Sequence, residues 1–236
     1  MDVVDLRPDL RLLQELPGQA YLLRHSGGVA LIDTGRVGRG EAVAAALRDW
    51  GLDRDSLTHV VLTHWHADHA GSAAEIAAWP GVLVLAHKAD ALVIRGVEVG
   101  AAHALTPSEQ ALHAVVAGDL PDAPPSRVDR ELDDQELITE IGARVIWTPG
   151  HTNGSIALHF ADADVLFTGD IAAEHDGQVI LGPFNVDRHL ARRSFRLLGD
   201  VTAGAVCFGH GRPLLGQDTD ALRVAACADS VPDPLA

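Results

Sequence analysis

The chain contains little cysteine, few aromatic residues and no long apolar stretch. Its 236 residues include two cysteines, one tyrosine and one methionine, and aromatic residues make up 4%. The two cysteines, Cys207 and Cys227, exclude a disulfide framework, and we expect no bond between them. No run of about 18 apolar residues is present, so no membrane-spanning helix is predicted. The first residues carry acids where a secretory signal needs basic residues, which favours a cytoplasmic protein.

Basic side chains are also scarce. Lys and Arg number 18 against 33 Asp and Glu, which gives a formal net charge of −15. Proteins that bind the nucleic-acid backbone or adhere to anionic membranes need a basic face. We therefore expect a small-molecule substrate and neither of these partners, and the sequence indicates no oligomeric state. The length, with 47% hydrophobic residues, fits one domain over residues 1–236.

Two rounds of strands and helices are predicted along the chain. Apolar β-rich runs between turn residues predict strands, and apolar residues at helical spacing predict helices. A hairpin is predicted over 19–34, and further strands over 58–64, 81–87, 143–149, 155–161, 164–170 and 205–210. Helices are predicted over 40–50, 71–79 and 186–198, with helical segments and loops over 88–134. This order indicates sheets covered by helices, and it fits both a four-layer sandwich and a single doubly wound sheet.

One short polar segment is unusually rich in potential metal ligands. The sequence THWHADH (63–69) places four of them within six residues: His64, His66, Asp68 and His69. They follow a predicted strand and precede a predicted helix. Packed imidazoles and carboxylates compete for hydration unless a cation lies among them, so the cluster predicts a metal site.

Three further candidates follow strands later in the chain. His151 lies in the sequence PGHT, Asp170 ends the strand DVLFTGD, and His210 lies in the sequence GHG. All candidates come at the C-terminal ends of predicted strands, so they converge if these strands share one edge. Five histidines and two aspartates suit zinc, and also iron or manganese. Two such ions, roughly 3.5–4 Å apart, could share a hydroxide and an aspartate.

Histidines that stand alone are expected to be solvated or hydrogen-bonded to the backbone. They are His25, His59, His87, His103, His113, His159, His175 and His189.

The sequence HWHADH, followed in order by PGHT, TGD and FGHG, resembles the metallo-β-lactamase-fold superfamily and its glyoxalase II and lactonase-like branch. The resemblance extends from the VALIDTG strand to Pro213. It implies an α/β fold, a four-layer αββα sandwich of two mixed sheets flanked by helices, with metals at one edge. It assigns His64, His66 and His151 to one metal ion, Asp68, His69 and His210 to a second, and Asp170 to a bridging position. Asp33 in LIDTG matches a supporting acid.

The resemblance implies a metallo-hydrolase with two divalent ions, Zn²⁺ before Fe or Mn. A metal-bridging hydroxide would attack an ester, thioester, lactone or amide carbonyl, with Asp68 orienting it. β-Lactamases of this fold usually have cysteine or serine where this chain has Asp170, so β-lactam or phosphodiester hydrolysis ranks third. Persulfide dioxygenases share the motif and use one iron, here on His64, His151 and Asp170. The intact His210 favours the two-metal hydrolase.

Several residues are candidates for shaping the substrate pocket. Trp65 could lie beside the metals or pack in the core. His175, His189 and segment 88–134 could approach the site. Glyoxalase II enzymes bind glutathione through basic residues on C-terminal helices. The predicted helix 186–198 carries four arginines that could meet an anionic substrate or form a solvated face: Arg188, Arg192, Arg193 and Arg196. Quorum-signal lactonases of this fold carry a tyrosine after the bridging aspartate, whereas the only tyrosine here is Tyr21.

Overall fold

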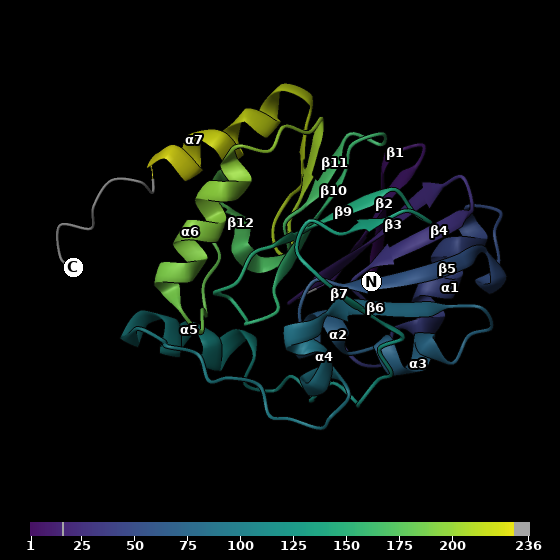
Figure 1. Cartoon of the computed structure of the whole chain (residues 1–236), viewed down its shortest axis with the longest axis horizontal. Coiled ribbons are helices and arrows are strands. Elements are labelled where there is room, and N and C mark those ends of the chain that lie inside the picture. The colour runs from purple at the N-terminus through teal and green to yellow at the C-terminus, as the bar shows by residue number, and fades with distance from the viewer. Residues whose placement is uncertain (16, 229–236) are drawn as a thin grey trace.

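Two stacked β-sheets form the centre of the computed structural model, which describes residues 1–15 and 17–228 (Figure 1). The first sheet has seven strands in the order β1 to β7, and the second has six in the order β15-β14-β11-β10-β9-β8. The first comprises β1 (Asp2–Arg7), β2 (Leu10–Gln14), β3 (Gln19–His25), β4 (Gly28–Ile32), β5 (Leu57–Leu62), β6 (Leu83–His87) and β7 (Arg130–Leu132). The second comprises β8 (Leu137–Ile138), β9 (Ala143–Trp147), β10 (Ile156–Phe160), β11 (Val165–Phe167), β14 (Ala205–Cys207) and β15 (Leu214–Leu215). A separate hairpin pairs β12 (Ala172–His175) with β13 (Gln178–Leu181).

Helices cover the outer face of each sheet (Figure 1). The first sheet is accompanied by α1 (Gly40–Asp49), α2 (Ala67–Ala70), α3 (Ala73–Ala77) and α4 (Lys88–Ile94). The second is covered by α6 (Arg188–Gly199) and α7 (Asp220–Ala228). Short 3-10 turns are η1 (Arg54–Ser56), η2 (Gly169–Ile171) and η3 (Gly216–Thr219). None of the helices in the described residues reaches the length and hydropathy that a membrane crossing requires.

Alternate side chains of the strands pack into different cores, because successive residues of a strand point to opposite faces. In β3, Leu22 packs with the helices over the first sheet, whereas Leu23 packs against the second sheet. In the second sheet, Phe167 faces the first sheet and Leu166 packs under α6 and α7. Three apolar layers therefore separate helix, sheet, sheet and helix. This confirms the αββα sandwich and excludes the single doubly wound sheet.

The predicted helix over 71–79 is wrong in its bounds. The structure has two short helices there, α2 and α3, separated at Gly71 and Ser72. Ser72 donates from its hydroxyl to the Arg36 carbonyl and accepts from the Arg39 amide at 2.7 Å. A Cβ at Gly71 would lie 2.5 Å from the Val37 amide nitrogen. The break in the helix thus allows the chain after β4 to pass close by.

Several strand ends meet at one edge of the sandwich. In the second sheet β10 is antiparallel to both β9 and β11, and β11 is parallel to β14. Strands β9, β11 and β14 therefore end at the same edge. The two sheets are joined there by a hydrogen bond of 2.9 Å from the Ile156 amide, at the start of β10, to the Thr63 carbonyl just after β5. The residues that follow β5, β9, β11 and β14 consequently lie together.

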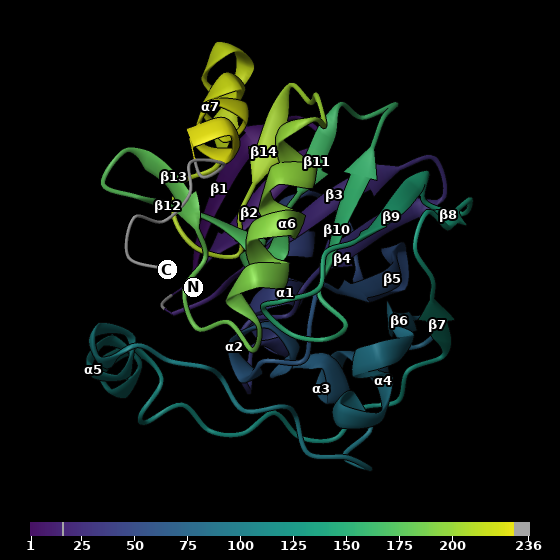
Figure 2. The same ribbon diagram turned by 60° about the vertical axis from the view of Figure 1, so that its left-hand side comes forward.

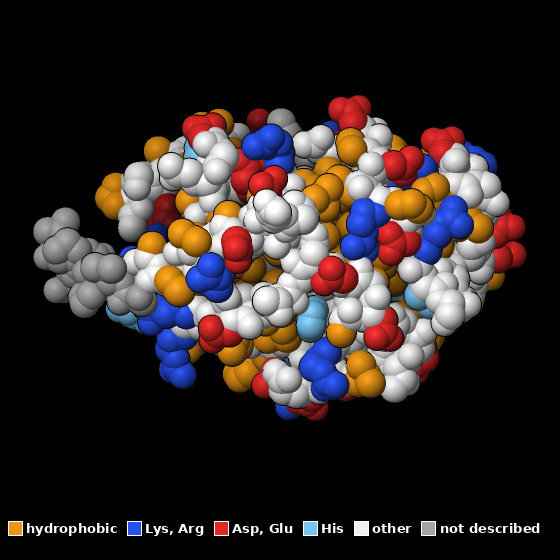
Figure 3. Space-filling model, turned by 90° about the horizontal axis from the view of Figure 1, so that it is seen from above, with side chains coloured by type: hydrophobic (Ala, Val, Ile, Leu, Met, Phe, Trp, Pro, Cys, Tyr) orange, Lys and Arg blue, Asp and Glu red, His pale blue; other side chains and the backbone are white. Residues whose placement is uncertain are grey.

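The segment between α4 and β7 leaves the sandwich and returns to it. It contains α5 (Pro107–Val116), which lies apart below α6 in Figure 2. Only Glu109 of α5 is buried. In the view from above, acidic and basic side chains are interspersed over the visible face of the molecule (Figure 3).

Candidate metal centre

The structure brings the seven predicted ligands into one cluster. Their donor atoms form overlapping groups within 4.8 Å: His64, His66 and His151; His64, His69 and Asp170; and Asp68, His69 and His210. The first four residues follow β5, with His66 as the residue that begins α2. The other three follow β9, β11 and β14. Strand ends from both sheets therefore supply the cluster.

The first three-histidine group is closely spaced. His66 Nδ1 lies 2.9 Å from His151 Nε2, and the His64 ring centre lies 4.6 Å and 4.7 Å from those of His66 and His151. Donors on a tetrahedral zinc with bonds of 2.0–2.1 Å are separated by about 3.3 Å. The donor nitrogens of His66 and His151 are thus close to the spacing of two ligands on a shared ion.

The second group is more acidic. His69 Nε2 lies 3.4 Å from His210 Nε2, and the Asp68 Oδ2 atom lies 3.4 Å from His210 Nε2. Asp170 lies between the two groups. Its Oδ2 atom is 3.5 Å from His151 Nε2 and 3.1 Å from His210 Nε2. A Cβ on Gly209 would overlap the Asp170 carboxylate and the His69 ring, so glycine is needed at that position.

The cluster fits divalent cations by its donor chemistry. His64 Nε2 and Asp170 Oδ1 are buried with no hydrogen-bond partner among the described residues. Burial lowers the pKa of His64, His66 and His151, which favours the neutral imidazole that binds metals. Burial alone would raise the pKa of Asp170, but His210 and His69 lower it well below its usual range. These neutral imidazoles and this ionised carboxylate are in the states that a cation requires. For His69 and His210, burial lowers the pKa but Asp170 and Asp68 raise it above its usual value, so a cation would displace a proton from these two rings.

Each remaining ring nitrogen is held by a neighbour, which fixes the ring orientation. His69 Nδ1 lies 2.9 Å from Asp33 Oδ2, as the supporting role of Asp33 requires, and Asp33 also accepts from the Thr63 amide at 2.7 Å. His64 Nδ1 lies 3.0 Å from Thr63 Oγ1. The Nδ1 atoms of the other two rings lie within hydrogen-bond distance of backbone carbonyls, that of His151 near Pro183 and that of His210 near Pro17.

His66 has a neighbour that sequence reasoning missed. Its Nε2 atom lies 2.9 Å from His103 Nε2, and the two ring centres are 4.8 Å apart. If His66 binds metal through Nδ1, its proton lies on Nε2 and is donated to His103. His103 was expected to be an isolated histidine, and nothing in its local sequence distinguishes it. Its place becomes visible only when segment 88–134 folds back over the site.

Asp90 was also missed. This buried carboxylate accepts hydrogen bonds from the Thr152 hydroxyl and the Gly154 amide, each at 2.7 Å, and from the Trp65 amide at 3.2 Å. Burial raises the pKa of Asp90 to about 6. It ties the loop that carries His151 to the loop of the HWHADH motif. A single aspartate at the start of α4 carries no motif that could have revealed this.

A pocket of about 180 Å³ opens over the cluster. It is lined by site residues and by residues of the segment around α5: Pro17, His66, Ala67, Asp68, His103, His113, Val116, Ala117, Leu120, Asp122, His151, Asp170, Phe184 and His210. Segment 88–134 therefore forms one wall. Phe184 adjoins this wall, because its ring centre lies 5.1 Å from that of His113.

Phe184 has an unusual backbone conformation. Its φ angle is 62°, in the left-handed region that side-chain-bearing residues avoid at a cost of about 1 kcal/mol. Bulky residues held in this region cluster at ligand-binding sites, where the surrounding structure fixes them. The strained backbone of Phe184 therefore indicates that the part of the pocket lined by Phe184 is a candidate ligand-binding surface.

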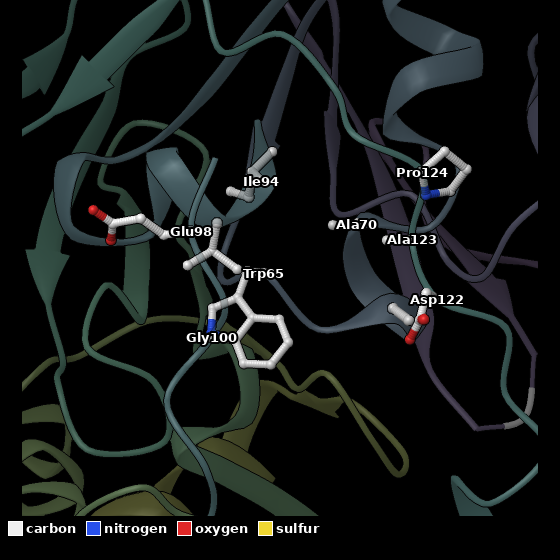
Figure 4. Close-up of a pocket in the computed structure, with 10 residues that line it drawn as sticks. Trp65, Ala70, Ile94, Glu98, Gly100, Asp122, Ala123 and Pro124 are labelled. Carbon is white, nitrogen blue, oxygen red and sulfur yellow. The ribbon is translucent and has the colours of Figure 1, made fainter. Parts of the chain in front are cut away.

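A second cavity of about 230 Å³ adjoins the first and shares Ala67 and Asp122 with it. Figure 4 shows Trp65 and Ile94 facing Ala123 and Pro124 across this cavity. The Trp65 ring centre lies 4.4 Å from that of His66. Trp65 therefore lies directly behind a candidate ligand and walls this second cavity.

Other predicted pocket residues lie away from the cluster. His175 is exposed at the end of β12 beside Asp176, and His189 is exposed in the first turn of α6. No lysine or arginine lines either cavity within residues 1–15 and 17–228, so the arginines of α6 do not reach them. Tyr21 lies between the sheets, where its hydroxyl donates to the Phe208 carbonyl at 2.7 Å. Cys207 and Cys227 form no disulfide, as expected.

Comparison with known proteins places this geometry in a family. The Metallo-beta-lactamase superfamily matches residues 13–210. Hydroxyacylglutathione hydrolase of Rhodospirillum rubrum is 33% identical over 152 residues, which are 64% of this chain and 46% of that protein. Thioesterase pkgB of Emericella nidulans is 28% identical over 199 residues, 83% of this chain and 46% of that protein. The chain thus spans about half the length of these two relatives.

The fold agrees with solved structures. A metallo-beta-lactamase family protein from Thermus thermophilus is 26% identical and superposes with a TM-score of 0.67, covering 94% of this chain and 78% of that chain. The family match spans most of the sequence, including every candidate ligand. The chain belongs to the metallo-β-lactamase superfamily.

Proposed function

We propose that the protein is a binuclear metal-dependent hydrolase that directs water to the carbonyl of an ester, thioester, lactone or amide. The observation that carries the proposal is the position of Asp170, whose Oδ2 atom lies 3.5 Å from a nitrogen of one histidine group and 3.1 Å from a nitrogen of the other. The names of the two relatives, a hydroxyacylglutathione hydrolase and a thioesterase, favour the same bond class.

The metal ligands follow from the two groups. His64, His66 and His151 would hold one ion, and Asp68, His69 and His210 the other, with Asp170 between them. Bound zinc, or iron or manganese, would lower the pKa of water to near ~7 and polarise the carbonyl oxygen. Imidazole and carboxylate donors suit these ions, with zinc the first choice.

The chain's own residues would orient the reactants. Asp68 lines the pocket, and its Oδ2 atom would accept a hydrogen bond from the attacking water and aim it at the carbonyl carbon. Asp33 holds His69, and His103 holds His66, so that both rings keep their direction during the reaction. The pocket walls would exclude bulk water.

The alternative is a dioxygenase with a single iron on His64, His151 and Asp170. The complete second group of Asp68, His69 and His210 favours the hydrolase, because a one-metal enzyme would leave three ligands without an ion. β-Lactams and phosphodiesters remain substrates to be tested beside carbonyl esters.

Metal content and hydrolysis, measured together, test the proposal. Protein purified without added metal would be assayed by elemental analysis and against chromogenic ester, thioester, lactone, β-lactam and phosphodiester substrates. We expect about two ions per chain and hydrolysis that a chelator abolishes and metal restores. Asp170→Asn, which keeps the side-chain shape, should lower both metal content and rate, whereas Asp162→Asn on the surface should change neither. One iron per chain, with oxygen consumed on a glutathione persulfide, would overturn the hydrolase.

A further inference from the structure

We infer that the substrate is uncharged and presents an apolar group to the wall made by Val116, Ala117, Leu120 and Phe184. This substrate class rests on the proposed hydrolase function and adds to it the chemistry that the pocket would select. Three observations support it: apolar residues line part of the pocket, acidic residues line both cavities, and Phe184 has a left-handed backbone conformation.

Part of the pocket lining is apolar. Val116 at the end of α5, with Ala117 and Leu120 just after it, faces the pocket that also contains Phe184. Within residues 1–15 and 17–228 these side chains remain partly exposed, and Val116 is 39% exposed. A substrate chain that enters toward Asp170 and His210 would bury them, since the same pocket holds both.

Acidic side chains line both cavities. Asp122 lies between the two cavities, and Glu98 lines the second. In the described chain, no lysine or arginine lines either space. A substrate with carboxylates remote from the scissile bond would therefore meet acidic side chains with no basic partner.

Three arginines of segments that adjoin the pocket are paired with acids of the chain. Arg188, at the start of α6, pairs with Glu109 of α5. Arg36 and Arg39 both pair with Glu15, with Arg36 at 2.9 Å. If one of these arginines turned toward an anionic substrate, Glu109 or Glu15 would lose an ion-pair partner.

A matched pair of thioesters tests the inference. S-Hexanoyl-N-acetylcysteamine is neutral, and S-hexanoylglutathione carries the same acyl group on an anionic carrier. We expect kcat/KM to be at least about tenfold higher for the neutral thioester. Among neutral thioesters, hexanoyl should exceed acetyl by about tenfold or more, because each methylene can contact the apolar wall.

Neighbouring valines of α5 provide matched variants. Val116 lines the pocket, whereas Val115 is 82% exposed and does not. Val116→Lys should raise kcat/KM for the glutathione thioester relative to the neutral one by about fivefold, the upper end of what an exposed ion pair contributes. Val115→Lys, with the same change of net charge, should leave this ratio unchanged.

Binding without turnover separates this inference from the proposed function. S-Hexyl-N-acetylcysteamine and S-hexylglutathione are thioethers that cannot be hydrolysed, and calorimetry would compare their affinities for wild type, Val116→Lys and Val115→Lys. Tighter binding of the neutral thioether, reduced or reversed by Val116→Lys alone, would support the pocket assignment even if the bond class were wrong. Preference for the glutathione compounds in wild type, or equal effects of the two variants, would overturn it. Turnover of both thioesters with equal efficiency would also overturn it while leaving the hydrolase intact.

Discussion

At the scale of single residues, the site consists of candidate metal donors and of side chains that contact these donors. His103 belongs to the second kind, since it lies 2.9 Å from the outer nitrogen of His66. Neighbours of this kind fix the tautomer and direction of a ligand ring. They influence metal affinity without touching the metal.

We predict that His103→Ala weakens metal binding about 10-fold or more, because His66 loses the partner of its Nε2 atom. Competition titration with a chromogenic chelator would measure the affinity. His175→Ala is the matched control, since His175 is exposed beside Asp176. Equal affinity of His103→Ala and wild type would show that His66 keeps its direction unaided.

Like His103, Asp90 is not a candidate ligand but contacts the segments that carry the candidate ligands. Asp90→Ala would leave the Thr152 hydroxyl and two backbone amides without their acceptor. We predict a loss of about 3 kcal/mol in the free energy of unfolding, since unsatisfied buried groups cost roughly 1–3 kcal/mol each. Thermal or urea unfolding would measure it. Glu41→Ala, which removes an exposed partner of Arg48, should change stability by less than about 1 kcal/mol.

The pKa of Asp90 also predicts a dependence of stability on pH. Burial raises that pKa from 3.8 to about 6, so the folded protein binds a proton more readily than the unfolded chain. The contribution of Asp90 to stability is therefore greatest below its unfolded pKa and declines as pH rises through its folded pKa. Asp90→Asn should remove this decline. The unfolding free energies of wild type and Asp90→Asn would be measured from pH 4 to 7 in the presence of a chelator. The stability of wild type relative to Asp90→Asn should fall as pH rises. A difference that does not change with pH would contradict the raised pKa of Asp90.

The motifs predicted the seven candidate ligands, which the structure brings together, and Asp33, which contacts His69. Asp90, His103 and Phe184 escaped prediction because each acts through a contact made only in the folded protein. Asp90 lies 62 residues from its partner Thr152, and His103 lies 37 residues from His66. No local pattern marks such pairs.

At the scale of elements, the strands that deliver the ligands were predictable and the edges of the fold were not. Apolar runs such as VLF in β11 indicated buried strands. By contrast, most residues of β1 are exposed, and β8 and β15 are two residues long each, so their sequences carry little strand signal. α5 is a further example, since only one of its residues is buried.

Helix α5 contacts the rest of the protein through the ion pair of Glu109 with Arg188 and the ring contact of His113 with Phe184. We predict that Arg188→Ala increases hydrogen exchange in residues 104–117 while exchange in α6 and the overall unfolding free energy change little, because α5 contributes few buried contacts. Mass spectrometry of exchanged peptides would measure this. Arg193→Ala, an exposed arginine of the same helix α6, is the control. Loss of protection throughout α6 would contradict a local attachment.

At the scale of the whole molecule, the clustered imidazoles and carboxylates couple metal binding to stability. Ions that bind the folded chain at about 100 times their Kd contribute about 2.7 kcal/mol. We predict that zinc raises Tm, and that a chelator lowers it, by roughly 5–10 °C for a protein of this size. Scanning fluorimetry across metal concentrations would measure this. The shift should be lost in His64→Ala, and a shift that persists in that variant would place the ions elsewhere.

Each ligand group draws two members from the chain before residue 70 and one from the chain after residue 150: His64 and His66 with His151, and Asp68 and His69 with His210. Neither half of the chain can therefore assemble a complete set alone. If the polypeptide were divided within the segment around α5, ion uptake would report the reassociation of the two fragments. The metal centre would then serve as a reporter of pairing between the two sheets, independent of any reaction that it carries out.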